Sequence, residues 1–333
     1  MARVGVGIGE AVLHPAAYSL MSDYFAPAER GRAFSLFSAA GTLGIALSWV
    51  FGGAVLAFLG NVGSLVLPAL GTSPTWKIVF LIAGVPGILL VPLLLTMHEP
   101  ARRERMGLHG ARGLTAMRVF LKQNRRAVGL VLIVNALIAL AGYGVIAWMA
   151  ASFVRVYGIK LGTAGLLCGL IMGAAALIGA PLGGYFADRF TLQARVGGKM
   201  LLPVFSGTLG AVAFSAWWLV NDLTTAVVLG IVAYSIQVAT TSTAGAALTD
   251  LVPNELRGQL SAIFLLVTGV AGIGLGPTCV ALVTDHVFHA EASVRYSMIV
   301  VAAPCLLLAA LLSWAGRSIY SETVAARRAE LLE

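Results

Sequence analysis

GAPLGGYFADRF, residues 179–190, stands at the end of a long apolar run and decides how the rest of the chain is interpreted. Gly183 and Gly184 leave room for a neighbouring helix to approach closely. Asp188 and Arg189 follow at once and place two opposite charges where the apolar run ends. The combination predicts the end of a membrane-spanning helix that packs tightly against another. A generic polar stop after a span would need neither the glycines nor the paired charges.

The composition of the whole chain is that of a membrane protein. Of 333 residues, 59% are hydrophobic and 11% are charged, whereas soluble domains carry roughly 25% charged residues. Runs of about 20 apolar residues, long enough to cross a bilayer core of roughly 30 Å, recur along the sequence. These features predict an all-α polytopic membrane protein. The net charge of +8 is explained by basic loops and not by nucleic-acid binding, and the three isolated cysteines have no metal-ligand spacing.

Nine membrane spans are predicted from the apolar runs. They lie near residues 2–22, 31–58, 76–97, 127–153, 162–187, 200–220, 224–249, 257–284 and 294–316. The one long linker, residues 98–126, is basic and is expected to be partly helical and cytoplasmic. It divides the chain into a three-helix part, residues 1–97, and a six-helix part, residues 127–316, which a tail at 317–333 follows.

The basic residues predict the orientation in the membrane. Of 22 Lys and Arg, 17 fall in loops on one side, which the positive-inside rule assigns to the cytoplasm. The C-terminus is therefore expected in the cytoplasm and, with nine spans, the N-terminus outside. A chain that starts outside with almost no leader inserts poorly, so further helices are expected before residue 1.

Two loops of the chain repeat each other, as they do in transporters built from two similar halves. One lies in SLMSDYFAPAERGRAFSLFSAAGTLG, residues 19–44, and the other in AALTDLVPNELRGQLSAIFLLVTGVAG, residues 246–272. At an offset of 227 residues, the matched residues are Asp23 with Asp250, Arg30 with Arg257 and Gly31 with Gly258. If the first span corresponds to the seventh, three helices are missing from the first half, which agrees with the orientation.

The chain resembles the major facilitator superfamily over all 333 residues. GGYFADR resembles the signature loop between the family's eighth and ninth helices, and the paired D-x7-G loops resemble its four-to-five and ten-to-eleven connections. RVGVGIGEAVLHP, residues 3–15, with SLMSDYF resembles the spinster-like and anion:cation symporter branches. The resemblance implies an N-terminally truncated major facilitator fold with nine transmembrane helices, equivalent to helices 4–12. It further implies a monomeric, cofactor-free, multi-pass transporter of the inner or plasma membrane.

Glu10 is the only one of the 14 acidic residues that falls in the middle of a span. It precedes Asp23 by 13 residues, which is roughly 20 Å along a helix, and an ionisable group at that depth marks a pathway or proton site by default. Arg3 and His14 lie on the same helix face. We expect Glu10 to accept the proton, Arg3 to pair with it or to bind a substrate anion, and His14 to relay the proton. The alternatives are a structural ion pair for Glu10, an Arg3 that reaches the membrane surface, and a His14 bonded to a carbonyl.

The second half supplies polar candidates for substrate binding. They lie at helical spacing on the fourth and seventh predicted spans, and are Asn135, Tyr143, Trp148, Tyr234, Gln237 and Thr241. Polar side chains that join helices to one another are an equally good interpretation of each. The charged and glycine positions of the signature and repeated loops, listed above, are expected to act in gating.

The sequence favours a proton-coupled secondary transporter of a small organic solute, expected to be an organic anion, that works by alternating access. Spinster-like transport of a lipid, amphiphile or drug is the alternative, and it would be favoured by an apolar cavity. An inactive fragment of such a transporter also fits. A dinucleotide-binding enzyme does not, because Gly5, Gly7 and Gly9 follow no strand and continue into an apolar helix.

Overall fold

The structure is a computed structural model of the chain. It describes residues 17, 24, 27–59, 64–67, 71–96, 111–194, 198–252 and 256–330. Within this part, seven helices are long and apolar enough to cross a membrane. The first predicted span, residues 2–22, lies almost wholly outside the described residues.

Every other predicted span is a helix. They are α2 (Pro27–Leu59), α3 (Thr75–Leu95), α5 (Arg125–Tyr157), α6 (Leu161–Ala194), α7 (Leu201–Leu219), α8 (Leu223–Leu251), the α9–α10 span and α11 (Val294–Glu330). The α9–α10 span is continuous from α9 (Arg257–Thr268) through the π-helix η3 (Gly269–Leu275) and α10 (Gly276–Val283) to a second π-helix, η4 (Thr284–Phe288). Its irregular middle follows from the glycine-rich GVAGIGL, because glycine tolerates the wider turn. Two short 3-10 turns, η1 (Gly198–Met200) and η5 (Glu291–Ser293), open α7 and α11.

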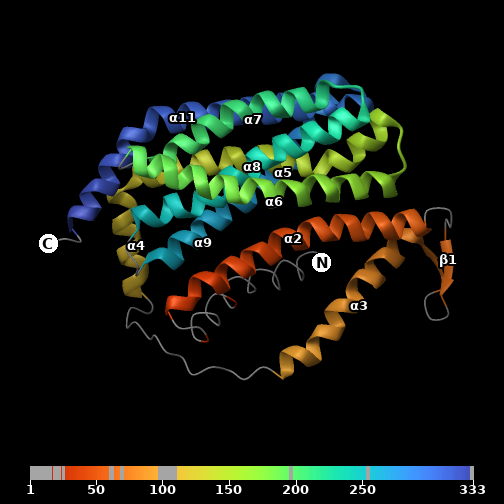
Figure 1. Cartoon of the computed structure of the whole chain (residues 1–333), viewed down its shortest axis with the longest axis horizontal. Coiled ribbons are helices and arrows are strands. Elements are labelled where there is room, and N and C mark those ends of the chain that lie inside the picture. Colours follow the sequence, from red (N-terminus) through yellow and green to blue (C-terminus); the bar gives the residue numbers. More distant parts are fainter. Residues whose placement is uncertain are drawn as a thin grey trace.

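The helices from α5 to α11 form one bundle and run side by side (Figure 1). α5 packs against α10 and α11, α6 against α8, and α7 against α8 and α11. Aromatic rings fill the interior of the bundle near the ends of α5 and α7, among them Phe153, Phe214, Trp217 and Trp218, all of which are fully buried. Trp217 and Trp218 stack with ring centroids 4.4 Å apart.

Glycines set how closely the bundle helices approach one another. A Cβ on Gly276 of α10 would lie 2.8 Å from the backbone nitrogen of Gly144 on α5. Gly183 of α6 meets the backbone of Ala239 on α8, whereas the next residue, Gly184, has nothing within 4 Å. Of the two signature-loop glycines, therefore, only Gly183 makes the close helix contact expected of both.

The bundle has two distinct ends. At one end, α4 (Ala111–Gln123), a helix within the linker, crosses the helix ends, and we call this the α4 end (Figure 1). At the other end, the hairpin of β1 (Ser64–Leu67) and β2 (Gly71–Pro74) connects α2 to α3, and we call this the hairpin end. The strands are antiparallel with Leu67 opposite Gly71. The predicted spans 31–58 and 76–97 leave these residues as a plain connection, and the short pairing satisfies backbone groups that an irregular loop would leave without partners.

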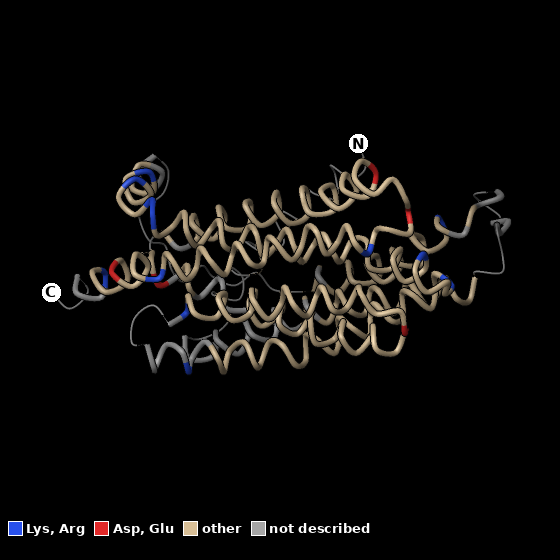
Figure 2. Tube along the Cα trace, turned by 90° about the horizontal axis from the view of Figure 1, so that it is seen from above, with Lys and Arg blue, Asp and Glu red and all other residues tan. Residues whose placement is uncertain are grey.

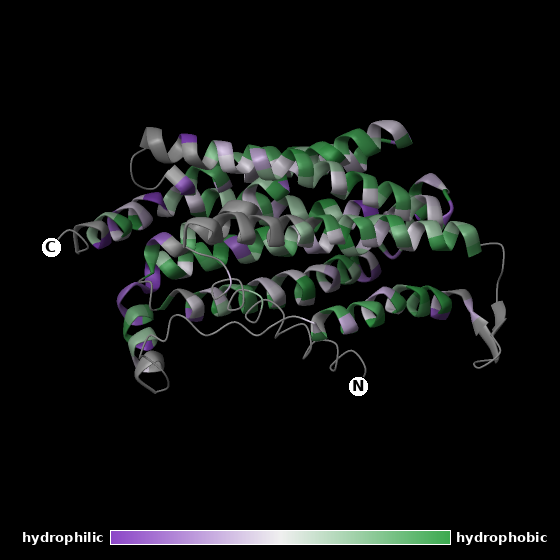
Figure 3. Cartoon of the chain, turned by 60° about the horizontal axis from the view of Figure 1, so that its bottom comes forward, coloured by the Kyte–Doolittle hydropathy of each residue, from purple (hydrophilic) through white to green (hydrophobic). Residues whose placement is uncertain are grey.

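Hydrophilic residues gather at α4 and the nearby end of α11, while the lengths of the helices are mostly hydrophobic (Figure 3). The linker is partly helical, as predicted. α11 continues as a helix to Glu330, well past the predicted membrane exit at residue 316, so the expected tail extends the last helix.

Candidate functional site

The contact between α2 and α6 is the main link between the N-terminal part and the bundle, and it lies near the hairpin end (Figure 1). It is made by small residues at helical spacing. These are Ala46, Val50, Gly53 and Ala57 on α2 and Gly162, Gly165 and Gly169 on α6. A Cβ on Gly53 would lie 2.7 Å from the backbone nitrogen of Leu166, and one on Gly165 would lie 2.8 Å from the Cα of Gly53. The two backbones therefore touch along this stripe, which we call the glycine seam.

Toward the α4 end, the same two helices separate. Gly41 and Gly44 of α2 have nothing within 4 Å, and Gly173 of α6 reaches only the Cβ of Ala46, at 3.6 Å. Beyond that point α6 exposes large apolar side chains, including Leu177 and Tyr185. In the described residues, α2 and α6 thus meet at the hairpin end and part toward the α4 end.

Three predicted substrate-binding residues lie at the buried contact of α5 with α8 and α9. Asn135 donates from Nδ2 to Oγ1 of Thr268 at 2.6 Å. Gln237 donates from Nε2 to the carbonyl of Ile138 at 2.8 Å, and the hydroxyl of Tyr234 donates to the carbonyl of Gly142 at 3.0 Å. All three side chains are occupied in joining helices. Their predicted role in binding substrate stays a prediction, and it would require each to exchange its present partner.

The other three predicted residues lie in different surroundings. Trp148 donates from Nε1 to the carbonyl of Pro277 at 3.0 Å. Tyr143 is partly exposed and covers Gly272 of η3, where a Cβ would meet its ring at 2.6 Å. Thr241 is exposed and bonds to the carbonyl of Gln237 in its own helix at 3.2 Å. Tyr143 and Thr241 are therefore the candidates with polar atoms that make no described bond to another helix.

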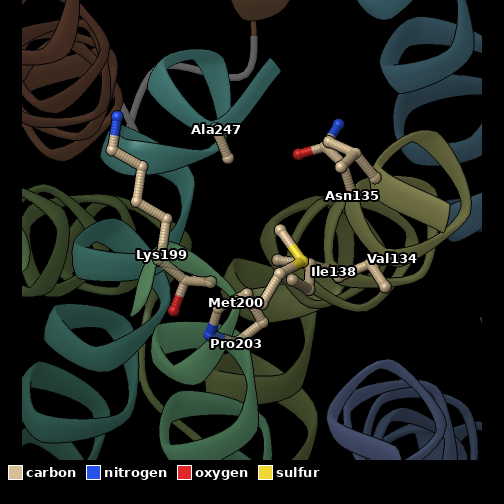
Figure 4. A pocket seen from close by; sticks show the side chains of 9 residues that line it. Val134, Asn135, Ile138, Lys199, Met200, Pro203 and Ala247 are labelled. Carbon is tan, nitrogen blue, oxygen red and sulfur yellow. The ribbon is translucent and has the colours of Figure 1, made fainter. Parts of the chain in front are cut away.

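A small pocket lies between α5, η1 and α8, close to the α4 end (Figure 4). It is lined by Val131, Val134, Asn135, Ile138, Lys199, Met200, Pro203, Thr240 and Ala247. Asn135 and Lys199 lie on opposite sides of it, with the side chain of Met200 between them (Figure 4). Its volume is about 20 Å³, which suits one water molecule and no organic solute. It does not form a solute-binding site.

Asp250, the acidic residue of the second repeated loop, interacts with side chains from two other elements, η1 and α11. Lys199 of η1 approaches its Oδ2 at 2.7 Å, and the hydroxyl of Tyr320 on α11 lies 3.4 Å from the same oxygen. Tyr320 also donates to the carbonyl of Ala247 at 3.0 Å, and Arg327 donates to that of Leu251 at 2.9 Å. The end of α8 is thereby joined to the loop before α7 and to α11. Neither Lys199 nor Tyr320 was predicted as a site residue, and the only sequence signal for Lys199 was its place among the basic loop residues.

The remaining signature and repeat positions are only partly described. Arg189 donates to the hydroxyl of Tyr185, one turn earlier, at 3.4 Å. Gly258, at the start of α9, has nothing within 4 Å. The side chains of Asp188, Arg257 and Arg30 are not described, although their backbones, like that of Gly31, lie in α6, α9 and α2. Arg3, Glu10, His14 and Asp23 lie outside the described residues, so the predicted proton site stays a prediction.

The hairpin end carries exposed polar contacts of a different kind. Arg155 pairs with Glu291 at 3.2 Å and lies over the ring of Trp148, 5.6 Å from its centroid. Asp222 caps α8 by accepting from the backbone nitrogen of Thr225 at 2.7 Å. The bonds from that backbone nitrogen and from the Thr225 hydroxyl hold the pKa of Asp222 below its ordinary value.

Known proteins with related sequences are transporters. The family model of the Major Facilitator Superfamily matches residues 1–277. An MFS-type efflux pump of Mycolicibacterium smegmatis is 28% identical over 328 residues, covering 97% of this chain and 72% of that protein. A probable L-galactonate transporter of Escherichia coli is 33% identical over 90 residues, covering 27% of this chain and 17% of that protein.

Solved structures of transporters share this fold. A bacterial homologue of the human lysosomal transporter Spinster, in an inward-facing and unoccupied conformation, superposes with a TM-score of 0.68 at 23% identity, over 97% of this chain and 76% of that one. Its occupied, inward-facing form superposes equally well, at 24% identity. The fold is confirmed as an all-helical, polytopic, major facilitator-like bundle. The chain belongs to the Major Facilitator Superfamily, a family of membrane transporters and not of enzymes.

Proposed function

We propose that this protein is a secondary active transporter that moves an amphiphilic organic solute by alternating access, driven by protons. One observation carries the proposal: α2 and α6 touch along the glycine seam at the hairpin end and part toward the α4 end. This is the arrangement of a transporter closed on one side of the membrane and open on the other. The inward-facing state named for both spinster-like structures supports the same interpretation.

The α4 end is proposed to face the cytoplasm. Basic residues are concentrated there, on α4, at the start of α5 and on the last turns of α11 (Figure 2). The hairpin end holds fewer, namely Lys77, Arg155, Lys160 and Arg295 among the described residues. The positive-inside rule supports this orientation, with the C-terminus in the cytoplasm of a cell with an inner or plasma membrane. The state described is then open to the cytoplasm.

The proposed solute is amphiphilic because the described spans offer it apolar walls. Their charged residues all lie at or beyond the ends of the predicted spans, and the part of α6 beyond the seam exposes Leu177, Leu182 and Tyr185. An organic anion, the expectation from the sequence, would have only Arg3 as a cation within a span, and Arg3 lies outside the described residues. The 28% identical relative from Mycolicibacterium smegmatis is an efflux pump, which supports movement out of the cell.

Proton coupling is assigned to Glu10. It is the one acidic residue in the middle of a predicted span, and a carboxyl group at that depth changes its charge when a proton binds. Arg3 and His14, on the same predicted helix face, are proposed to modulate that protonation. Binding of the proton and of the solute would then favour opposite states of the glycine seam.

Transport by the purified chain in liposomes tests the proposal. With an imposed pH gradient, ethidium serves as the amphiphilic probe and benzoate as the anionic one. We expect gradient-driven movement of ethidium, its loss in Glu10→Gln, and no loss in the control Glu322→Gln, which changes an exposed glutamate near the end of α11. Movement of benzoate alone would overturn the amphiphile in favour of the anion. If ethidium moves equally well without the pH gradient and in Glu10→Gln, proton coupling is overturned. If neither probe moves, transport by this chain is overturned.

A further inference from the structure

The linker helix α4 (Ala111–Gln123) differs from every other long helix that the structure describes. It lies across the end of the bundle rather than along it (Figure 1), and Figure 2 shows it end-on. Met117 and Phe120 are buried against the end of the bundle, in a cluster that includes Val128, Leu251 and Val324. One face of α4 is thus anchored to the protein, and its axis runs parallel to the proposed membrane surface.

The outward side of this region is strongly basic. Arg118 and Lys122, four residues apart, share one side of α4, and Arg125 and Arg126 open α5 directly afterwards. All four side chains are exposed, and none forms an ion pair within the part of the chain that the structure describes. The sequence between residues 105 and 187 contains no Asp or Glu. The four charges, which we call the α4 basic surface, therefore have no acidic neighbour along the chain to neutralise them.

The depth of this surface is given by the neighbouring helix α11. Gly316 packs directly against Leu130 of α5, so the two residues lie at one level. Beside Gly316, Trp314 is exposed and Arg317 lies 4.0 Å above its ring centroid. An exposed Trp with an adjacent cation is typical of the boundary between lipid tails and headgroups. Arg126 is four residues from Leu130, about 6 Å along the helix, which places the α4 basic surface at the level of the headgroups.

We propose that the α4 basic surface binds the phosphate headgroups of anionic phospholipids in the cytoplasmic leaflet. Negative headgroups at the same depth complement four exposed cations, and clusters of Lys and Arg at a membrane surface bind such lipids. Arg118 and Lys122 can each contact a phosphate from the same side of α4, while Arg125 and Arg126 hold lipid against the end of α5. The inference rests on the proposed orientation alone and not on the solute or on proton coupling.

Binding to lipid of stated composition tests it. The purified chain, in neutral micelles, is titrated with dioleoylphosphatidylglycerol and, separately, with dioleoylphosphatidylcholine. We expect a preference for the glycerol lipid that weakens with added salt, and a loss of roughly five-fold in affinity for each charge removed. The variant R118Q/K122Q/R125Q/R126Q should bind both lipids alike. The control K77Q/K160Q removes two exposed basic residues at the hairpin end and should bind like the unaltered chain, whereas the double variant R118Q/K122Q, which removes the same number of charges from α4, should lose affinity for the glycerol lipid.

Other outcomes would overturn the proposal. The lipid site is disproved if the unaltered chain binds the two lipids with equal affinity, or if the four-fold variant keeps its preference for the glycerol lipid. Displacement of the lipid by excess inorganic phosphate would identify a site for free anions instead, and capture of an acidic protein without lipid preference would identify a protein-binding surface. If the four-fold variant does not fold, the single variant Lys122→Gln and the salt titration test the proposal instead. An affinity for the glycerol lipid that neither of them lowers would overturn it. Glu10→Gln should bind lipid normally, so failure of transport and failure of lipid binding are separate results.

Discussion

α3 and α5 are almost equally hydrophobic, yet α3 is almost wholly exposed and α5 is half buried within the protein. Their most apolar stretches have mean hydropathies of 2.1 and 2.4, but 6% of that stretch is buried in α3 and 50% in α5. Gly84 and Gly87 of α3 have nothing within 4 Å, whereas Gly142 and Gly144 of α5 lie against α8 and α10. Hydropathy therefore determines that a helix crosses the membrane, while small and polar residues in the right places determine which helices it meets.

The largest effect is expected where two glycines face each other. Gly276→Leu would place a side chain against the backbone of Gly144 and Leu140, which cannot move aside, and we expect a loss of roughly 3 kcal/mol in the free energy of unfolding. The control is Gly87→Leu in α3, where the added side chain meets open space. Unfolding of both variants in mixed detergent micelles measures the difference. Similar losses in the two variants would contradict the role given to close glycine contact.

The glycine seam should show the next largest effect, on transport more than on folding. Gly53→Leu would separate α2 from α6 and disfavour the state closed at the hairpin end, by about 100-fold if the clash costs about 3 kcal/mol. Gly52→Leu is a matched control, because the neighbouring glycine has nothing within 4 Å. Proton-driven transport in liposomes, measured as proposed above, should fall in the first variant and persist in the second. Equal transport by both would show that the seam does not open during transport.

The two ion pairs at opposite ends of the bundle should differ in strength. Lys199 and Asp250 are only 19% and 29% exposed, and Tyr320 supports their contact. A double-mutant cycle on unfolding should give about 1–2 kcal/mol for this pair. Arg155 and Glu291 serve as the comparison, with Glu291 82% exposed, and their coupling should stay below about 0.5 kcal/mol. A stronger coupling at the hairpin end would reverse the comparison.

The smallest effect is expected at the exposed cap of α8. Because hydrogen bonds from Thr225 lower the pKa of Asp222 in the folded protein, the charged cap stabilises the fold above the ordinary pKa of 3.8. That contribution disappears as the pH falls through the lowered pKa. Asp222→Asn should therefore lower the melting temperature slightly at pH 7, and the difference should vanish in strong acid. Asp285→Asn, which changes an exposed aspartate that caps no described helix, is the control and should leave the melting temperature at pH 7 unchanged.

Much of the fold was predictable, because membrane spans are long and their signal is strong. The predicted span 31–58 corresponds to Pro27–Leu59, and 127–153 to Arg125–Tyr157. The predictions failed where a short contact decides the outcome. Gly183 and Gly184 are adjacent in sequence, but a turn of about 100° between neighbouring helical residues brings only the first against α8. The hairpin at residues 64–74 was missed for a similar reason, since its pairing depends on how α2 and α3 end.

The sequence predicted several residues of the candidate site, but it did not predict which residues they bond to. Asp250 was recognised from the repeated loop. Its ion-pair partner Lys199 lies 51 residues away in the sequence and belongs to no recognisable motif. Asn135, Tyr234 and Gln237 were recognised as polar residues within spans, and both interpretations, substrate binding and helix contact, were open. Their hydrogen bonds, which join α5 to α8 and α9, become visible only when the helices are assembled.

The sequence by itself determined that this chain crosses a membrane repeatedly, roughly where its spans lie, which loops carry most of the positive charge, and the family to which it belongs. These properties depend on local composition, because each apolar run must satisfy its backbone within its own helix. Only the tertiary structure decided that α2 meets α6 at one end, that Lys199 reaches Asp250, and that α4 lies across the bundle. Those contacts depend on the rotation and depth of whole helices, which small side chains far apart in the sequence set together.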